Sequence, residues 1–171
     1  LPKRKKGIGM AVNEYLSAVD LATDIRAKKV SPVEVMDECI AAIEARNPSI
    51  NAFTYTAFDE ARKKAVEAEK ALMCGDAEGV FFGIPTAAKH FLPGVPGWPG
   101  TTGGVKALSR MKDASYGGFT KAMVDGGAIL VGKTNSPSFA FRGTCDNKMF
   151  GATSTPFRVG YNSGGSSGGS A

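Results

Sequence analysis

The chain has 171 residues, of which 43% are hydrophobic and 22% are charged, and its formal net charge is +5. This composition is typical of one globular domain with a sizeable core, and it predicts neither a membrane-spanning segment nor a secretory signal. Much of the positive charge lies in residues 3–6, a basic cluster that we interpret as a solvated tail rather than a nucleic-acid contact.

Three cysteines are spread widely along the chain, at Cys39, Cys74 and Cys145. Their odd number and wide spacing predict neither a disulfide framework nor a zinc site. We therefore expect a reducing compartment, the cytoplasm, and neither a metal nor another cofactor.

Residues 15–79 are predicted to be helical. Ser17 with Asp20 can begin one helix. Residues 31–34, Ser-Pro-Val-Glu, form a second start signal, because serine can cap, proline fits the first helical position and glutamate completes a capping box. Pro48 is expected to end this second helix, whose apolar face is predicted to consist of Val35, Cys39 and Ile43.

A third helix is predicted from residue 58 to Gly75, where glycine can form the C-cap. Its apolar stripe consists of Phe58, Ala61, Ala65, Ala68 and Leu72. We interpret the three helices as scaffold, because such stripes mostly pack into a core; a partner-binding face is the alternative.

The pattern changes after Gly79. Residues 83–88 and 128–131 are short apolar runs typical of buried strands, and a helical stretch lies between them at residues 119–124. Residues 136–137, Ser-Pro, can begin another helix. This alternation predicts an α/β sheet with parallel neighbours, in which chemistry gathers at the strand ends.

Both predicted strands are followed by a lysine, Lys89 and Lys133. If Lys89 is enclosed by its apolar neighbours, its pKa falls, and a neutral amine beside a hydroxyl is a competent general base. The alternative is a lysine whose ammonium reaches solvent at the strand end. The pattern suits Lys133 equally well, so it does not choose between the two.

Two other residues are ambiguous. His90 is the only histidine and hence the only candidate base for a Ser-His-Asp or Cys-His hydrolase. In an extended segment it points away from Lys89, so only one of the two is expected in a site, and a structural role is the favoured interpretation. Trp98, in the Pro/Gly-rich loop 93–104, either lines a substrate entrance or lies on a surface loop.

The chain closes on S-G-G-S-S-G-G-S-A, residues 163–171. A phosphate loop would need a lysine after the glycines, which is absent. By composition alone the tail is a flexible spacer or a loop that presents serine hydroxyls.

Several stretches occur together in a specific order. Residues 83–89 are G-I-P-T-A-A-K, residues 127–139 are G-A-I-L-V-G-K-T-N-S-P-S-F, and residues 150–157 are F-G-A-T-S-T-P-F, followed by the tail. The first third adds S-P-V-E-V and N-P-S-I-N-A-F. From about residue 15 onward, this ordered set resembles the amidase signature family of serine hydrolases. The resemblance implies an α/β fold, with part of a mixed, largely parallel central sheet and flanking helices. It also implies one domain, residues 1–171, which consists of a basic tail (1–14), a helical part (15–79) and an α/β catalytic part (80–171).

The resemblance also implies a Ser–cis-Ser–Lys triad. Lys89 matches the triad lysine and Ser166 the bridging serine, in a supporting loop that comprises Gly165, Ser167, Gly168 and Gly169. The family's nucleophile lies in a later glycine-rich segment, beyond Ala171, so we expect this chain to be an N-terminal portion that is inactive alone, with apolar surface exposed. His90 departs from the family, which commonly has Asp after the lysine.

The implied function is hydrolysis of a carboxamide to a carboxylic acid and ammonia or an amine, through an acyl-serine intermediate. The alternatives are an amidotransferase A-type subunit that acts on misacylated tRNA with partner subunits, and an inactive fragment. The expected partners are a small-molecule amide and the remaining C-terminal part as a separate chain, with a homodimer left open. Neither a membrane nor a nucleic acid is expected.

Overall fold

The computed structural model of the chain describes residues 17–91 and 94–171. The predicted basic tail, residues 1–14, and the first position of the predicted loop, Pro93, lie outside the described residues. Within the described ranges, no helix combines the length and the apolar character needed to cross a membrane. The elements, in chain order, are α1 (Ala18–Arg26), α2 (Pro32–Ile50), β1 (Phe53–Thr56), α3 (Phe58–Cys74), β2 (Pro85–Lys89), a 3-10 turn (Lys106–Leu108), α4 (Gly118–Asp125), β3 (Ile129–Thr134), a second 3-10 turn (Ser138–Ala140), β4 (Asp146–Asn147) and β5 (Gly151–Ala152).

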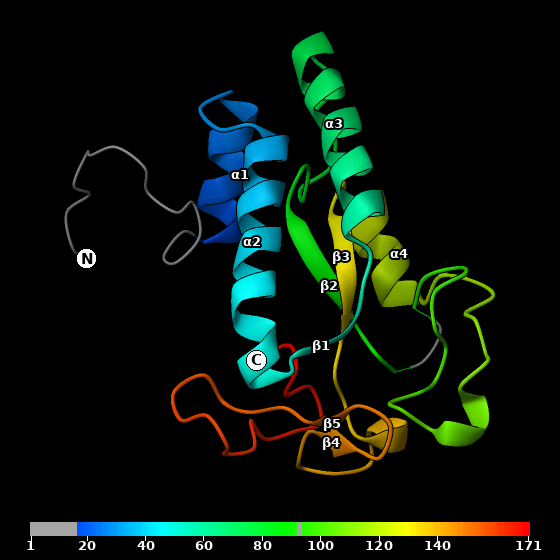
Figure 1. Cartoon of the computed structure of the whole chain (residues 1–171). Coiled ribbons are helices and arrows are strands. Elements are labelled where there is room, and N and C mark those ends of the chain that lie inside the picture. Colours follow the sequence, from blue (N-terminus) through cyan, green and yellow to red (C-terminus); the bar gives the residue numbers. More distant parts are fainter. Residues whose placement is uncertain (1–16, 92–93) are drawn as a thin grey trace.

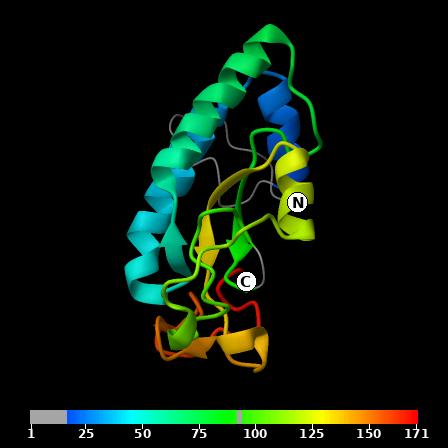
Figure 2. The ribbon, with the colours of Figure 1, turned by 90° about the vertical axis from the view of Figure 1, so that its right-hand side faces the viewer.

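A three-stranded sheet of order β1-β3-β2 forms the centre of the fold. Helices α2 and α3 lie on one side of the sheet and α4 on the other, while the short pair β4-β5 lies beyond one end of it (Figures 1 and 2). Strands β2 and β3 are parallel, as predicted, and Lys89 is level with Thr134. Strand β1 is antiparallel to β3 and lies in the region predicted to be helical, so that prediction was wrong for residues 53–56.

Local capping signals set the helix starts as predicted. The Ser17 side chain accepts from the backbone of Asp20, and Ser31 and Glu34 form the complete capping box at the start of α2. The expectation that Pro48 ends α2 was wrong, because the helix continues to Ile50. Proline removes a single N–H so close to the helix end, and the Asn47 side chain supports that turn by two hydrogen bonds to the backbone of Phe53, of 2.7 and 3.1 Å.

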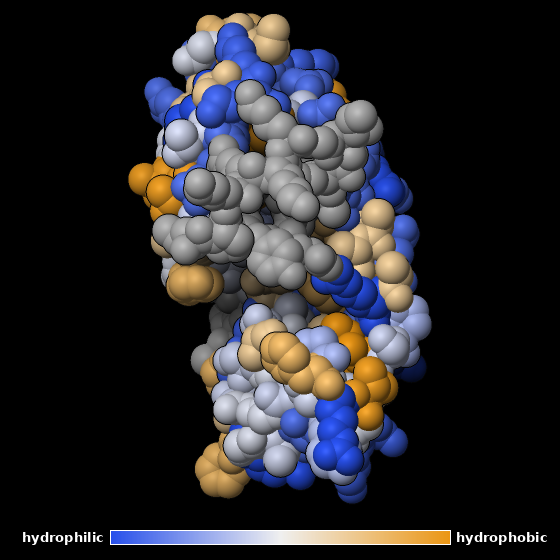
Figure 3. Space-filling model, turned by 90° about the vertical axis from the view of Figure 1, so that its left-hand side faces the viewer, coloured by the Kyte–Doolittle hydropathy of each residue, from blue (hydrophilic) through white to orange (hydrophobic). Residues whose placement is uncertain are grey.

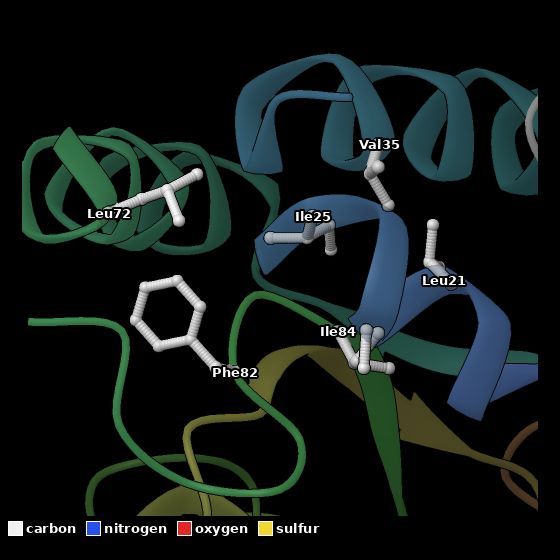
Figure 4. Close-up of a cluster of buried hydrophobic side chains, with 7 residues drawn as sticks. Leu21, Ile25, Val35, Leu72, Phe82 and Ile84 are labelled. Atoms are coloured by element: carbon white, nitrogen blue, oxygen red, sulfur yellow. The ribbon is translucent and has the colours of Figure 1, made fainter. Parts of the chain in front are cut away.

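Helix α3 ends at Gly75, which adopts the left-handed conformation with φ of 89°. One core cluster joins α1, α2 and α3 to the segment before β2, as Figure 4 shows for Leu21, Ile25, Val35, Leu72, Phe82 and Ile84. A second cluster packs α2 and α3 onto β3 and consists of Met36, Ile40, Ala61, Ala65, Ile129 and Val131. The predicted face of α2 is thus rotated, since Cys39 and Ile43 are only partly buried.

Two further predictions need correction. Trp98 is only 4% exposed and packs against Tyr55 and Val95, with its indole N–H donated to Glu60 at 3.1 Å, so it is a core residue rather than an entrance or surface residue. The Ser136-Pro137 signal precedes a single 3-10 turn and not an α-helix.

Large apolar side chains are exposed in the C-terminal segment, where Phe141 and Phe157 are 89% and 97% exposed. Figure 3 shows one face of the molecule, with hydrophobic groups among hydrophilic ones at its lower end. Exposure of several large apolar side chains in one segment is typical of a surface that another protein part covers.

Candidate active site

The structure brings Lys89 and the serine pair together across 77 residues of sequence. Lys89 is the last residue of β2, and its Nζ lies 2.8 Å from Ser166 Oγ and 3.0 Å from Ser167 Oγ. Burial lowers the pKa of Lys89 below its usual value of 10.5, and nearby Cys145 partly opposes this effect. An amine of lowered pKa in contact with a hydroxyl can exchange a proton with it.

The glycine-serine tail is folded against the sheet and is not a spacer. Gly168 and Gly169 are buried, and a Cβ at Gly169 would lie 2.4 Å from the backbone nitrogen of Asn135, so no side chain fits there. At Gly165 a Cβ would lie 2.8 Å from the carbonyl oxygen of Arg142. The peptide bond between Gly165 and Ser166 is cis, the geometry that the resemblance implied. The glycines therefore let the serine loop approach the backbone of its neighbours closely.

Asn135, which directly follows β3, joins the tail to the sheet. Its backbone carbonyl accepts from Gly169 N–H at 3.3 Å, and its side chain donates to Gly151 and Thr153 and accepts from Asn147 at 2.7 Å. The sequence interpretation missed this residue. Its available signal was a polar side chain two residues beyond Lys133, in the polar stretch that follows the predicted strand 128–131.

Lys133 is completely buried and forms an ion pair with Asp113, so its predicted alternative as a solvent-reaching lysine was wrong. Its Nζ also donates to Pro99 O at 2.6 Å, and the Asp113 carboxylate accepts from the N–H groups of Gly94 and Val95. Burial lowers the pKa of Lys133, while the hydrogen bond and the charge of Asp113 oppose the shift. The pair ties the loop that follows β2 to β3.

His90 is 1% exposed, and both its ring nitrogens contact threonine hydroxyls, Nδ1 with Thr54 at 2.8 Å and Nε2 with Thr101 at 2.9 Å. Because both nitrogens are occupied, His90 is not arranged to activate a serine. Across the described ranges, no three His, Cys, Asp or Glu side chains gather where they could hold a metal ion.

Comparisons with known proteins agree with this geometry. A family model described as Amidase matches residues 34–171. The chain is 35% identical over 157 residues to the A-type subunit of the Glutamyl-tRNA(Gln) amidotransferase of Agathobacter rectalis, covering 91% of this chain and 30% of that protein. It is 31% identical over 153 residues to an Acylamidase of Rhodococcus erythropolis, covering 90% and 32%.

The solved structure of a bacterial aryl acylamidase of the amidase signature enzymes superposes with a TM-score of 0.86 at 42% identity, over 90% of this chain and 32% of that one. The chain thus spans about a third of the length of the relatives that it matches. Since the family model covers most of the sequence, the chain belongs to the amidase family, the family of the amidase signature enzymes.

Proposed function

We propose that the chain supplies the lysine base and the bridging serine of an amide hydrolase, which cleaves a carboxamide to a carboxylic acid and ammonia or an amine. The proposal rests above all on one contact, the 2.8 Å between Lys89 Nζ and Ser166 Oγ. The lowered pKa of Lys89 supports it, because a base must be neutral to take a proton.

In the proposed reaction Lys89 takes the proton of Ser166, and Ser166 takes the proton of a nucleophilic serine. That serine attacks the amide carbonyl carbon, and the Lys89–Ser166 pair returns the proton to the departing nitrogen as the C–N bond breaks. Water then attacks the acyl-serine ester by the same proton relay and releases the acid. Backbone N–H groups near the nucleophile would stabilise the oxyanion in both steps.

We further propose that residues 1–171 form the N-terminal part of one amidase signature domain, with residues 80–171 as its catalytic part, and that the nucleophile belongs to a segment following residue 171. The exposed apolar side chains of the C-terminal segment support a remaining part that packs there, on the same or a separate polypeptide. Cys39, Cys74 and Cys145 are unpaired, which supports the cytoplasm as the compartment.

A chimera tests the proposal. This chain replaces the matching third of the aryl acylamidase, and hydrolysis of a 4-nitroanilide is followed by release of the coloured amine. We expect hydrolysis by the chimera, and a loss of about 10²- to 10⁴-fold in kcat in both Lys89→Met and Ser166→Ala, the range for removal of general acid–base catalysis. Ser49→Ala, at an exposed serine of α2, is the matched control. Turnover that survives either site substitution contradicts the triad assignment, and a well-folded chimera without activity supports the inactive-fragment alternative.

The likeness to the A-type subunit of Glutamyl-tRNA(Gln) amidotransferase supports a second candidate, a subunit that acts on misacylated tRNA with partner subunits. The substrate distinguishes the two candidate functions. Glutamine-dependent amidation that needs partner subunits and tRNA indicates the amidotransferase subunit. Hydrolysis of a simple anilide without partner subunits or tRNA indicates the amide hydrolase.

A further inference from the structure

His90 lies at a junction of three segments beside Lys89. Its side chain contacts Thr54 of β1 and Thr101 of the loop after β2, and the ring of Phe150 packs against it with centroids 5.2 Å apart. Its backbone N–H donates to Thr134 O at 2.9 Å, and its carbonyl accepts from Ser136 Oγ at 2.9 Å. The residue that follows the proposed base is therefore held at both its main chain and its side chain.

The β1 strand reaches His90 because it is irregular. Phe53 is level with Thr134 and Tyr55 with Lys133, so the register shifts at Thr54, between them. Such irregularities re-aim a side chain beside active sites. Here the Thr54 hydroxyl contacts both the His90 ring and the carbonyl of Lys133, the latter at 3.3 Å.

The hydrogen-bond partners select one form of the imidazole. Thr54 has one hydroxyl hydrogen, which it donates to Lys133 O, so its oxygen accepts from Nδ1–H of His90. Nε2 then carries no hydrogen and accepts from the hydroxyl of Thr101, whose oxygen in turn accepts from Gly104 N–H at 3.2 Å. With the opposite tautomer, or the protonated ring, the Thr101 hydroxyl hydrogen would have no acceptor among the residues that the structure describes.

We propose that His90 is a positioning residue for Lys89: a neutral Nδ1–H imidazole, fixed by Thr54 and Thr101, anchors the end of β2 so that the Lys89 amine meets Ser166. The proposal rests on the proposed role of Lys89 as the base. A neighbouring residue fixed in this way restricts the rotation of the Lys89 backbone and side chain. Misplacement of a catalytic group by about 1 Å can lower the rate of the catalysed reaction about a hundredfold.

The charged groups around the ring agree with a neutral imidazole. Burial, the largest cause, and the charge of Lys133 together lower the pKa of His90 to about 4, while the charge of Asp113 and a backbone hydrogen bond with Pro99 oppose the shift. Of the two residues adjacent to His90 in the sequence, Lys89 is titratable and Phe91 is not. We therefore expect the threonine-bound imidazole to persist from neutral pH down to about pH 4.

The tautomer is measured directly on the ¹⁵N-labelled chain by long-range proton–nitrogen correlation NMR, where the single histidine gives one set of ring signals. We expect Nδ1 at the shift of a protonated nitrogen and Nε2 at that of an unprotonated one, unchanged between pH 8 and pH 5. The Nε2–H form, an averaged pair of shifts, or a titration midpoint near the usual 6.5 overturns the proposal.

Positioning of Lys89 is tested by Thr101→Val, which removes the hydroxyl donor and keeps the side-chain shape. We expect the pKa of Lys89, followed by its amine resonance, to rise toward its usual value as the amine loosens from Ser166, and Thr101→Ser to restore it. Thr120→Val, at a buried threonine of α4, is the matched control and leaves the pKa of Lys89 unchanged.

A Thr101→Val chain that is less stable but has the same Lys89 pKa overturns the positioning role, since it reveals a structural residue only. These NMR measurements need no enzymatic turnover, so they test the positioning role of His90 separately from the proposed amide-hydrolase function. If Lys89→Met in the chimera stays active while the NMR results are as expected, the proposed function fails and the geometry of His90 stands.

Discussion

Replacing Lys133 by methionine removes an ammonium that is 0% exposed and leaves the Asp113 carboxylate, 7% exposed, without its cation. Breaking a buried ion pair from one side costs about 3–5 kcal/mol, because an uncompensated charge stays buried. Asp113 retains two backbone donors, Gly94 N–H at 3.0 Å and Val95 N–H at 3.2 Å, so we place the loss near the lower end, about 3 kcal/mol. Native domains are stable by about 5–15 kcal/mol, so the variant remains folded at 25 °C.

Urea unfolding followed by circular dichroism measures the loss. With a urea dependence of about 1–3 kcal/mol per molar, the midpoint falls by roughly 1–3 M. Adding Asp113→Asn removes the stranded charge and retains an acceptor for both N–H groups, so the double variant is expected to recover at least about half of the loss. Lys112→Met, at an exposed lysine, is the control. A loss below about 1 kcal/mol, or a double variant no more stable than Lys133→Met, refutes the reasoning.

Two further outcomes follow from the site. Because burial lowers the pKa of Lys89, the amine loses its proton at a lower pH than a free lysine does. We therefore expect kcat/KM of the chimera to rise with pH, with the midpoint of the rise below 10.5. A midpoint at or above 10.5 contradicts Lys89 as a desolvated base. Gly169→Ala places a Cβ 2.4 Å from the backbone nitrogen of Asn135 and 2.7 Å from Ala52 O, so we expect it to displace the serine loop. The chimera should then lose activity, and the pKa of Lys89, measured by NMR titration, should rise toward 10.5. Gly143→Ala meets no atom within 4 Å and is the control; equal behaviour of the two variants means that the loop does not depend on this close approach.

Features written in neighbouring residues were predictable from the sequence. The capping box at Ser31 needs only a hydroxyl and a carboxylate three residues apart, and the end of α3 needs only a glycine after an apolar stripe. The parallel pair β2-β3 followed from two apolar runs with a helix between them. The candidate site was predicted through family resemblance, because the composition of the tail alone favoured a spacer.

Features decided by distant partners were not predictable. Lys133 looked like a lysine that reaches solvent because its counter-ion, Asp113, lies 20 residues earlier in a loop without periodicity. Trp98 looked exposed for the same reason, since Tyr55 of β1 and Glu60 of α3, both far from it in the sequence, contact its indole ring. Strand β1 has four residues between two long helices, too few for a pattern of alternation to be recognised.

The central strand β3 ends in two polar residues that bind in different directions. Lys133 pairs with Asp113 in the loop that follows β2, and the Thr134 hydroxyl lies 2.6 Å from Ser170 Oγ of the tail. Neighbouring side chains in a strand point to opposite faces, so a slip of β3 by one residue would turn the ammonium away from Asp113 and the hydroxyl away from the serine loop at once. An error of strand pairing would therefore be penalised on both faces of the sheet, and the segment that carries the site would dock only on a correctly aligned β3.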